Sequence, residues 1–172
     1  LPVTYDENTN EITFLEEDAF TDGSGKFKVT AEIDEVVPVV INKSDKPIYF
    51  SIIEINSKGE VVPFLPNDEF NLNDNERMIL PGKKMIFKDC RYGFYDPYET
   101  LILKGFASSK PINFKPTVQS RGESATRGIS NPLEGFIGQT YTQTRGSGSK
   151  KASGRIDGYS TEFIYEIVRS KE

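Results

Sequence analysis

The first feature of this sequence that bears on chemistry is a residue type it lacks, because its 172 residues include no histidine. Without histidine, neither a Ser-His-Asp triad nor a Cys-His pair can form within the chain, and the commonest transition-metal ligand is missing. The single cysteine, Cys90, lies beside Arg91 and near Lys88, which are cations of the kind that lower a thiol pKa. A lone cysteine without histidine is more typical of a small buried hydrophobic residue, which is the role we expect. We predict no catalytic residue and no cofactor.

Acidic and amide side chains crowd the segment Asp68–Glu76, which reads DEFNLNDNE. Oxygen ligands at this density would suit Ca²⁺, which takes about six to eight of them. The residues do not follow the Asp-x-Asp-x-Asp-Gly order, however, and Asn and Asp are also the ordinary residues of surface turns. We therefore expect a solvated polar loop and predict no metal site, with calcium binding left open as the alternative.

An aromatic cluster in the stretch YGFYDPY offers the best candidate binding surface of the chain. Exposed rings on a loop between strands can stack on sugar rings or hold a partner protein. The alternative is that these rings close one end of the hydrophobic core, in a protein that has no tryptophan. The candidate binding residues are Tyr92, Phe94, Tyr95 and Tyr98.

Length and composition predict one domain that spans residues 1–172. A chain of 19.3 kDa is long enough to bury a core without disulfides or a structural metal. The net charge of −5 argues against nucleic acid as the main partner, since phosphate binding needs clustered cations. No run approaches the roughly 18 apolar residues of a membrane helix. The chain begins at Leu1 rather than Met, so we expect it to be part of a longer protein.

Two segments show the strand period most clearly. Lys26–Asp34 alternates, and its apolar side chains, the last of them Ile33, are expected on one face. Pro47–Asn67 (PIYFSIIEINSKGEVVPFLPN) contains two apolar runs on either side of a turn, in which Gly59 is free to take a positive φ. The first run is apolar on both faces, as expected of a central strand covered on two sides.

Shorter apolar runs at intervals of about 8–12 residues complete the pattern of an all-β domain. Asn131–Tyr141 has an Asn N-cap, a following Pro and apolar residues at helical spacing, which predicts a short helix. Residues 142–158 are rich in Gly and Ser and predict a flexible internal loop. We therefore predict an immunoglobulin-like antiparallel β-sandwich with one short helix before the last strand. The further strands are expected in Glu11–Leu15, Val36–Asn42, both halves of Arg77–Asp89, Glu99–Phe106 and Tyr159–Val168.

Three segments carry a family resemblance: PIYFSIIEINSKGEVVPFLPN, MILPGKK (Met78–Lys84) and PYETLILKGFASSKPINF (Pro97–Phe114). Together they resemble the bacterial domain of unknown function found C-terminal to caspase-like peptidase domains. The resemblance covers Val37–Phe114 and the closing strand, although the glycine that usually precedes the Pro-x-Glu-x-Leu motif is represented only by Gly93, further upstream. It implies a caspase-like peptidase domain in the same polypeptide, and it transfers no site residue.

These observations favour a non-catalytic accessory module that places substrate or a partner for a larger caspase-like protease. The alternative is a carbohydrate- or cell-surface-binding module that uses the aromatic loop Tyr92–Tyr98. A third hypothesis is an enzyme with paired carboxylates, as in glycoside hydrolases, which would need two acids to converge in a cleft.

Overall fold

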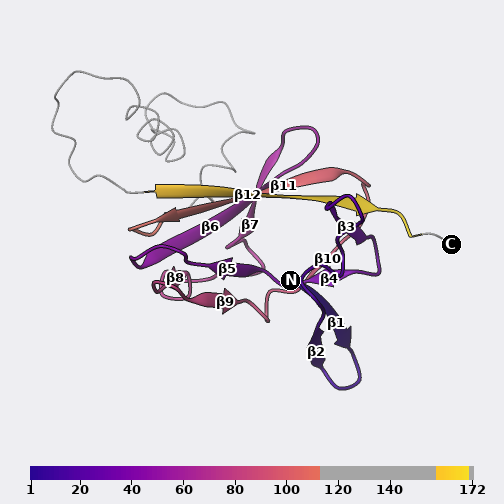
Figure 1. Ribbon diagram of the computed structural model, residues 1–172, viewed down its shortest axis with the longest axis horizontal. Coiled ribbons are helices and arrows are strands. Elements are labelled where there is room, and N and C mark those ends of the chain that lie inside the picture. The colour runs from indigo at the N-terminus through magenta and orange to yellow at the C-terminus, as the bar shows by residue number, and fades with distance from the viewer. Residues whose placement is uncertain (113–157, 171–172) are drawn as a thin grey trace.

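The computed structural model describes residues 1–112 and 158–170, and all the regular elements in these ranges are β-strands (Figure 1). The all-β prediction is therefore confirmed. The helix expected at Asn131–Tyr141 and residues 142–157 of the expected loop lie outside the described residues, while Gly158 begins the last strand. Across the described ranges there is no helix long and apolar enough to cross a membrane. The strands are β1 (Pro2–Asp6), β2 (Glu11–Phe14), β3 (Phe27–Thr30), β4 (Glu35–Val36), β5 (Val39–Ile41), β6 (Ile48–Ile55), β7 (Val61–Leu65), β8 (Met78–Ile79), β9 (Lys84–Ile86), β10 (Tyr92–Gly93), β11 (Thr100–Ser108) and β12 (Gly158–Val168).

The largest sheet has six strands in the order β3-β12-β11-β6-β7, with β8 also paired to β6. The predicted central strand is confirmed, because β6 has β11 on one side and β7 and β8 on the other. The turn between β6 and β7 takes the expected conformation, with Gly59 at a φ of 78°. This positive φ is open to glycine at little cost, so the residue type decides the turn.

One strand pair corrects the prediction of a fully antiparallel fold. β12 runs parallel to β3, with Tyr165 opposite Phe27 and Val168 opposite Thr30. A parallel pair needs a long connection, and nearly the whole chain lies between these two strands. The period of a strand cannot show its direction, so the sequence pattern contained no signal for this pairing.

Two local predictions are also corrected. Ile33 is 64% exposed instead of facing the core, because Glu32 adopts a φ of 63° and reverses the chain after β3. The strands predicted on either side of Pro81-Gly82 are confirmed as β8 and β9, of which β8 pairs with β6 and β9 pairs with β5. The predicted strand Val36–Asn42 is interrupted at Pro38 into β4 and β5, which belong to different sheets.

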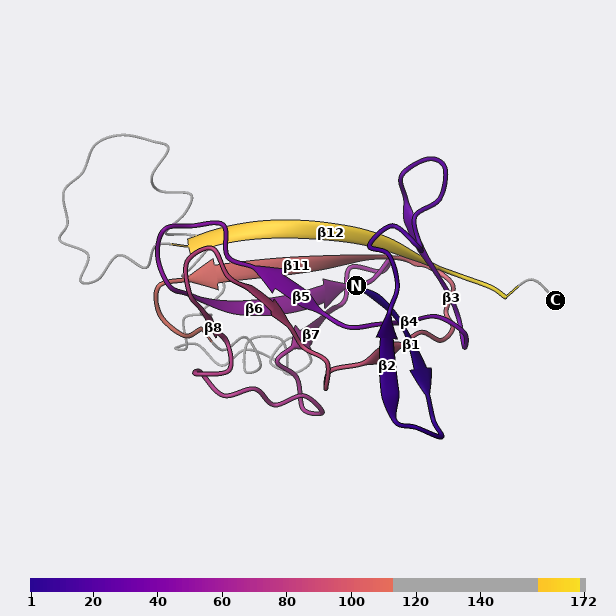
Figure 2. The same cartoon turned by 60° about the horizontal axis from the view of Figure 1, so that its bottom comes forward.

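The two smaller sheets pack against the large one through two apolar clusters (Figure 2). The pair β5–β9 contributes Val40 and Met85 to a cluster built mainly on β6, β7 and β8. The four-stranded sheet β10-β4-β1-β2 contributes Val36 to a second cluster, built on β3, β11 and β12. This layered packing is consistent with a β-sandwich. The buried members are Ile48, Phe50, Phe64, Leu65, Ile79, Phe87 and Cys90 in the first cluster, and Val29, Ala31, Phe94, Leu101, Tyr165 and Ile167 in the second.

Within the described ranges the interior holds one cation, Arg77, which is only 3% exposed. Its Nη1 atom donates to Ser51 Oγ at 2.9 Å and to the Ile112 carbonyl oxygen at 2.8 Å. Its Nη2 atom pairs with the carboxylate of Asp74, whose side chain is 59% exposed. The backbone is tied here as well, since the Phe50 N–H donates to the Arg77 carbonyl oxygen at 3.2 Å. Arg77 thus joins the central strand, the polar loop before β8 and the segment after β11.

Replacing this cation should destabilise the fold strongly. We expect Arg77→Ala to lower the free energy of unfolding by about 3 kcal/mol, because the hydrogen bonds of the guanidinium to Ser51, Ile112 and Asp74 are lost and its removal leaves a cavity in the interior. Urea denaturation of the variant and the wild type measures this difference. Arg169→Ala is the matched control, since Arg169 is exposed and its loss should change stability by less than about 0.5 kcal/mol. Equal effects of the two substitutions would contradict the role given to Arg77.

Candidate functional site

The fold divides the four aromatic candidates into two pairs. Tyr92 stacks on Phe64 with ring centroids 4.2 Å apart, and its hydroxyl donates to the Phe64 carbonyl oxygen at 2.6 Å. Phe94 is 7% exposed and meets Tyr165 edge to face at 5.5 Å. Tyr92 and Phe94 therefore close the two apolar clusters, which is the alternative that the sequence left open for these rings.

The other two candidates lie on the surface. Tyr95 is 66% exposed, and its ring lies beside Gly93. Tyr98 is 48% exposed, and the guanidinium carbon of Arg169 lies 5.4 Å from the centroid of its ring. That distance is within the range of a cation–π contact. Arg169 follows β12, so the contact joins the loop before β11 to the chain beyond the last strand.

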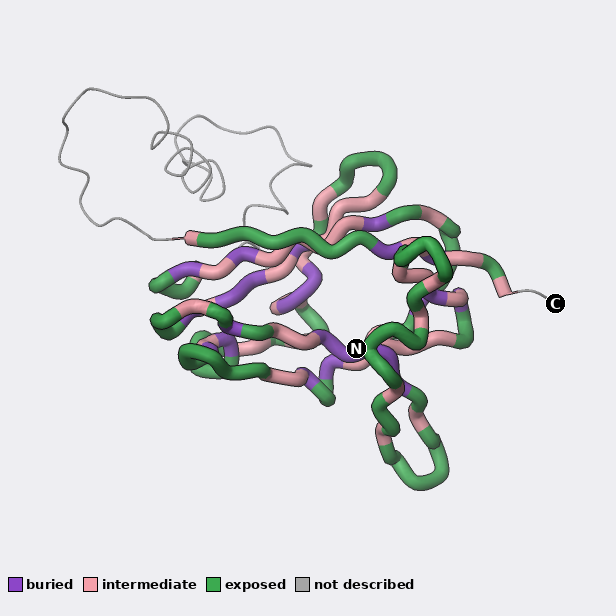
Figure 3. Tube along the Cα trace, in the orientation of Figure 1, coloured by how far each residue is buried: buried purple, intermediate pink, exposed green. Residues whose placement is uncertain are grey.

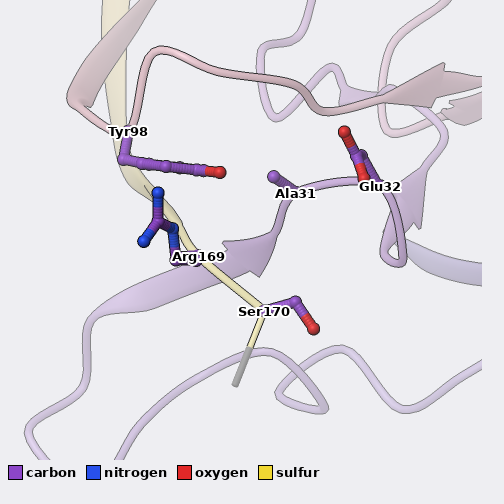
Figure 4. Close-up of a pocket in the computed structure, with 5 residues that line it drawn as sticks. All are labelled: Ala31, Glu32, Tyr98, Arg169 and Ser170. Atoms are coloured by element: carbon purple, nitrogen blue, oxygen red, sulfur yellow. The ribbon is translucent and has the colours of Figure 1, made fainter. Parts of the chain in front are cut away.

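Tyr98 and Arg169 line a cleft of about 490 Å³, which we call the Tyr98 cleft. In Figure 4 these two side chains lie next to each other, Glu32 lies across from them, and Ala31 lies between. The hydroxyl of Ser170 adds a further polar group. The lining residues are Ala31, Glu32, Tyr98, Arg169 and Ser170.

Main-chain hydrogen bonds fix the segments that form this cleft. The Ala31 N–H donates to the Val168 carbonyl oxygen at 2.9 Å, which extends the pairing of β3 with β12 by one residue. The Glu32 N–H donates to the Phe94 carbonyl oxygen at 2.8 Å. With a φ of 63°, Glu32 occupies the left-handed region, which costs a non-glycine residue about 1–2 kcal/mol. The turn that carries the Glu32 side chain into the cleft is thus held by its neighbours.

The cleft offers a mixed set of recognition groups. Arg169 can bind a carboxylate through paired N–H groups, while Glu32 can accept from an ammonium or a hydroxyl. Tyr98 presents a planar apolar face with a polar tip, which suits a side chain or a sugar ring. Sequence reasoning found Tyr98 but missed Glu32 and Arg169, because they lie far from it in the chain and ordinary charged residues give no local signal.

The polar loop Asp68–Glu76 uses several of its oxygens within itself. Asn73 Oδ1 accepts from the Asn75 N–H at 2.9 Å, and Glu76 Oε2 accepts from the Asn73 N–H at 2.7 Å. Asp74 pairs with the buried Arg77. Within residues 1–112 and 158–170, no three acidic, histidine or cysteine side chains are grouped so as to hold a metal ion.

Cys90 has the buried position expected of it. It is 3% exposed and belongs to the first apolar cluster. Burial raises the pKa of its thiol, and the negative charges of Asp89 and Glu76 add to that effect. The thiol is therefore less reactive than an exposed cysteine, in spite of its basic neighbours in the sequence.

A half-buried acid–phenol pair was not predicted. Glu54 lies near the C-terminal end of the central strand, and its Oε2 atom accepts from the Tyr165 hydroxyl at 2.6 Å. Burial raises the pKa of Glu54; the hydrogen bond from Tyr165 opposes this shift, and the nearby charge of Glu99 adds to it. The pair connects β6 to β12 across the intervening strand β11. The available signal was the one acidic residue within a mostly apolar central strand.

Comparisons with known proteins found no relative of this chain. The sequence matches no family model, and neither a curated protein nor a solved structure shows significant similarity to the chain.

The half-buried Glu54 makes the stability of the fold depend on pH. Because the folded-state pKa of Glu54 lies above its ordinary value of 4.5, the neutral acid favours the fold. The stabilisation that the neutral acid provides is fully present below pH 4.5, and it is lost as the pH rises through the folded-state pKa of Glu54. We expect Glu54→Gln to gain stability relative to the wild type at pH 7, and to gain less at pH 4. Urea midpoints at the two pH values measure the change.

Glu99 provides a control of opposite sign. The Ser57 hydroxyl and N–H donate to its carboxylate, the N–H at 2.9 Å, and these bonds lower its pKa. The ionised form of Glu99 therefore stabilises the fold above its ordinary pKa. The Glu99→Gln variant should be less stable than the wild type at pH 7, and this difference should shrink as the pH falls. The interpretation of both pKa shifts would be wrong if the two variants responded to pH in the same direction.

Proposed function

We propose that this chain is a non-catalytic interaction module of a larger caspase-like protease, and that the Tyr98 cleft binds a peptide segment of a substrate or partner. The sequence resemblance over Val37–Phe114 supports the association with a peptidase. The observation that carries the binding role is the exposed Tyr98 ring, with Arg169 over it and Glu32 across the cleft. A peptide can offer a carboxylate to the cation, a cation to the carboxylate and a side chain to the ring.

The proposed architecture is an immunoglobulin-like sandwich. In variable-type immunoglobulin domains, strands G, F, C and C′ lie side by side in one sheet. The order β12-β11-β6-β7 supports the same arrangement here, with the last strand, the strand before it and the central hairpin in succession. In this architecture the Tyr98 cleft lies at the end of the large sheet, and its residues come from the segments directly after β3, before β11 and after β12.

The regulatory role is tested in the whole protein. Expressed alone, the chain should show no peptidase activity. Its deletion from the full-length protein should alter substrate choice, localisation or stability. If deletion changes none of these properties, the proposed role is wrong.

Point variants test the cleft itself. We expect Tyr98→Ala and Arg169→Ala each to weaken peptide binding by about tenfold, as is typical when an aromatic or arginine anchor is truncated. Binding is measured by titrating immobilised peptide libraries, or the peptidase domain, with the chain. Tyr95→Ala is the matched control, because Tyr95 is another exposed tyrosine of the same loop and does not line the cleft. If Tyr95→Ala weakens binding and Tyr98→Ala does not, the peptide does not bind in the Tyr98 cleft.

The exposure of both tyrosines also favours a second candidate, a carbohydrate- or cell-surface-binding module. Two exposed rings three residues apart offer stacking surfaces for sugar rings. For this function Tyr95→Ala and Tyr98→Ala should both abolish binding on a glycan array, whereas Arg169→Ala should matter less. Absence of any ligand across a broad glycan panel would exclude this candidate in favour of the peptide site.

A further inference from the structure

Among the residues that the structure describes, the N-terminal half of β12 lies at an edge of the large sheet. On one side, β12 pairs with β11 from Gly158 to Glu166. On the other side, β3 begins only opposite Tyr165. For Gly158–Ile164, therefore, the described part of the chain supplies a strand partner on one side only. The backbone N–H and carbonyl groups of such an edge form a template for another strand.

The side chains along this edge are unusually apolar for a surface. Tyr159 is 64% exposed, Phe163 is 47% exposed and Ile164 is 57% exposed. The exposed colour runs along this part of β12 in Figure 3 and gives way to buried residues near its C-terminal end. Large apolar residues concentrated on one edge are typical of an interaction surface.

The edge also lacks the features that usually prevent strand addition. The segment GYSTEFI contains no proline and no lysine or arginine, and its one acid, Glu162, pairs with Lys104 of β11 at 2.9 Å. The opposite edge of the same sheet differs, because β7 contains Pro63, which cannot donate a hydrogen bond to an added strand. Strand addition is thus impeded at β7, whereas the described residues along the β12 edge present no such obstacle.

We propose that two copies of this chain associate through Gly158–Ile164, as antiparallel strands related by a two-fold axis at Thr161. Thr161 is the midpoint of the free edge, so this register pairs the whole edge with itself. Each added strand then ends where β3 of the other copy begins, opposite Tyr165. The result is one continuous sheet through both copies, with a closed two-fold interface.

The residues that this register brings together are complementary. Tyr159 lies opposite Phe163 of the second copy, so two aromatic pairs form across the interface, and such pairs stabilise antiparallel strands. Glu162 lies opposite Ser160, which keeps the two acids apart. Thr161 lies opposite its own copy at the axis, and this is the one position where a substituted charge must face itself.

A charge-swap experiment at that position tests the proposal. Light scattering coupled to size-exclusion chromatography should show the 172-residue wild type as a dimer of 19.3 kDa subunits. Thr161→Lys and Thr161→Glu should each raise the dimer dissociation constant at least about fivefold, because like charges then oppose each other at the axis. An equal mixture of the two variants should restore the dimer. Val62→Lys, at an exposed position of β7 on the opposite edge, is the control and should leave the dimer unchanged.

Circular dichroism and urea midpoints show whether each Thr161 variant is folded, and restoration by mixing excludes a simple loss of structure. A monomeric wild type over the whole accessible range of concentration would overturn the proposal. So would a dimer that survives Thr161→Lys, a dimer lost with Val62→Lys, or open-ended filaments in place of a closed pair.

Discussion

The buried guanidinium of Arg77 is the contact on which the rest of the structure depends. It holds the central strand through Ser51, the polar loop through Asp74 and the segment after β11 through the Ile112 carbonyl oxygen. Taking a cation out of water is costly unless hydrogen bonds compensate it, and here three separate segments accept hydrogen bonds from its two terminal nitrogen atoms. The loop before β8 is thus part of the fold, and its acids orient backbone and cation.

The strands with a strong local pattern could be predicted from the sequence. The central hairpin, the turn glycine Gly59 and the last strand all follow from period and turn chemistry. Strand direction and partner choice depend on contacts between distant segments, so the parallel pairing of β3 with β12 carried no local signal. Ile33 shows the same limit, because the left-handed Glu32 interrupts a pattern that the residue types continue.

The aromatic loop could be recognised from the sequence, but the sequence could not show which of its rings are buried and which are exposed. Tyr92 and Phe94 are core residues, whereas Tyr95 and Tyr98 remain on the surface. Two residues that complete the Tyr98 cleft, Glu32 and Arg169, come from a turn after β3 and from the chain after β12. The chain topology brings the charged residues of this cleft together, and the order of residues along the sequence does not reveal that topology.

The parallel strand pair has a consequence for biosynthesis. Among the described strands, β3 reaches the large sheet through β12 alone, although it is made early and β12 late. During synthesis on the ribosome, the apolar cluster that contains Val29 and Leu101 therefore cannot form until the last strand, β12, has been made. Pairings this distant in sequence slow folding and leave apolar surface exposed in the nascent chain until the last strand is in place.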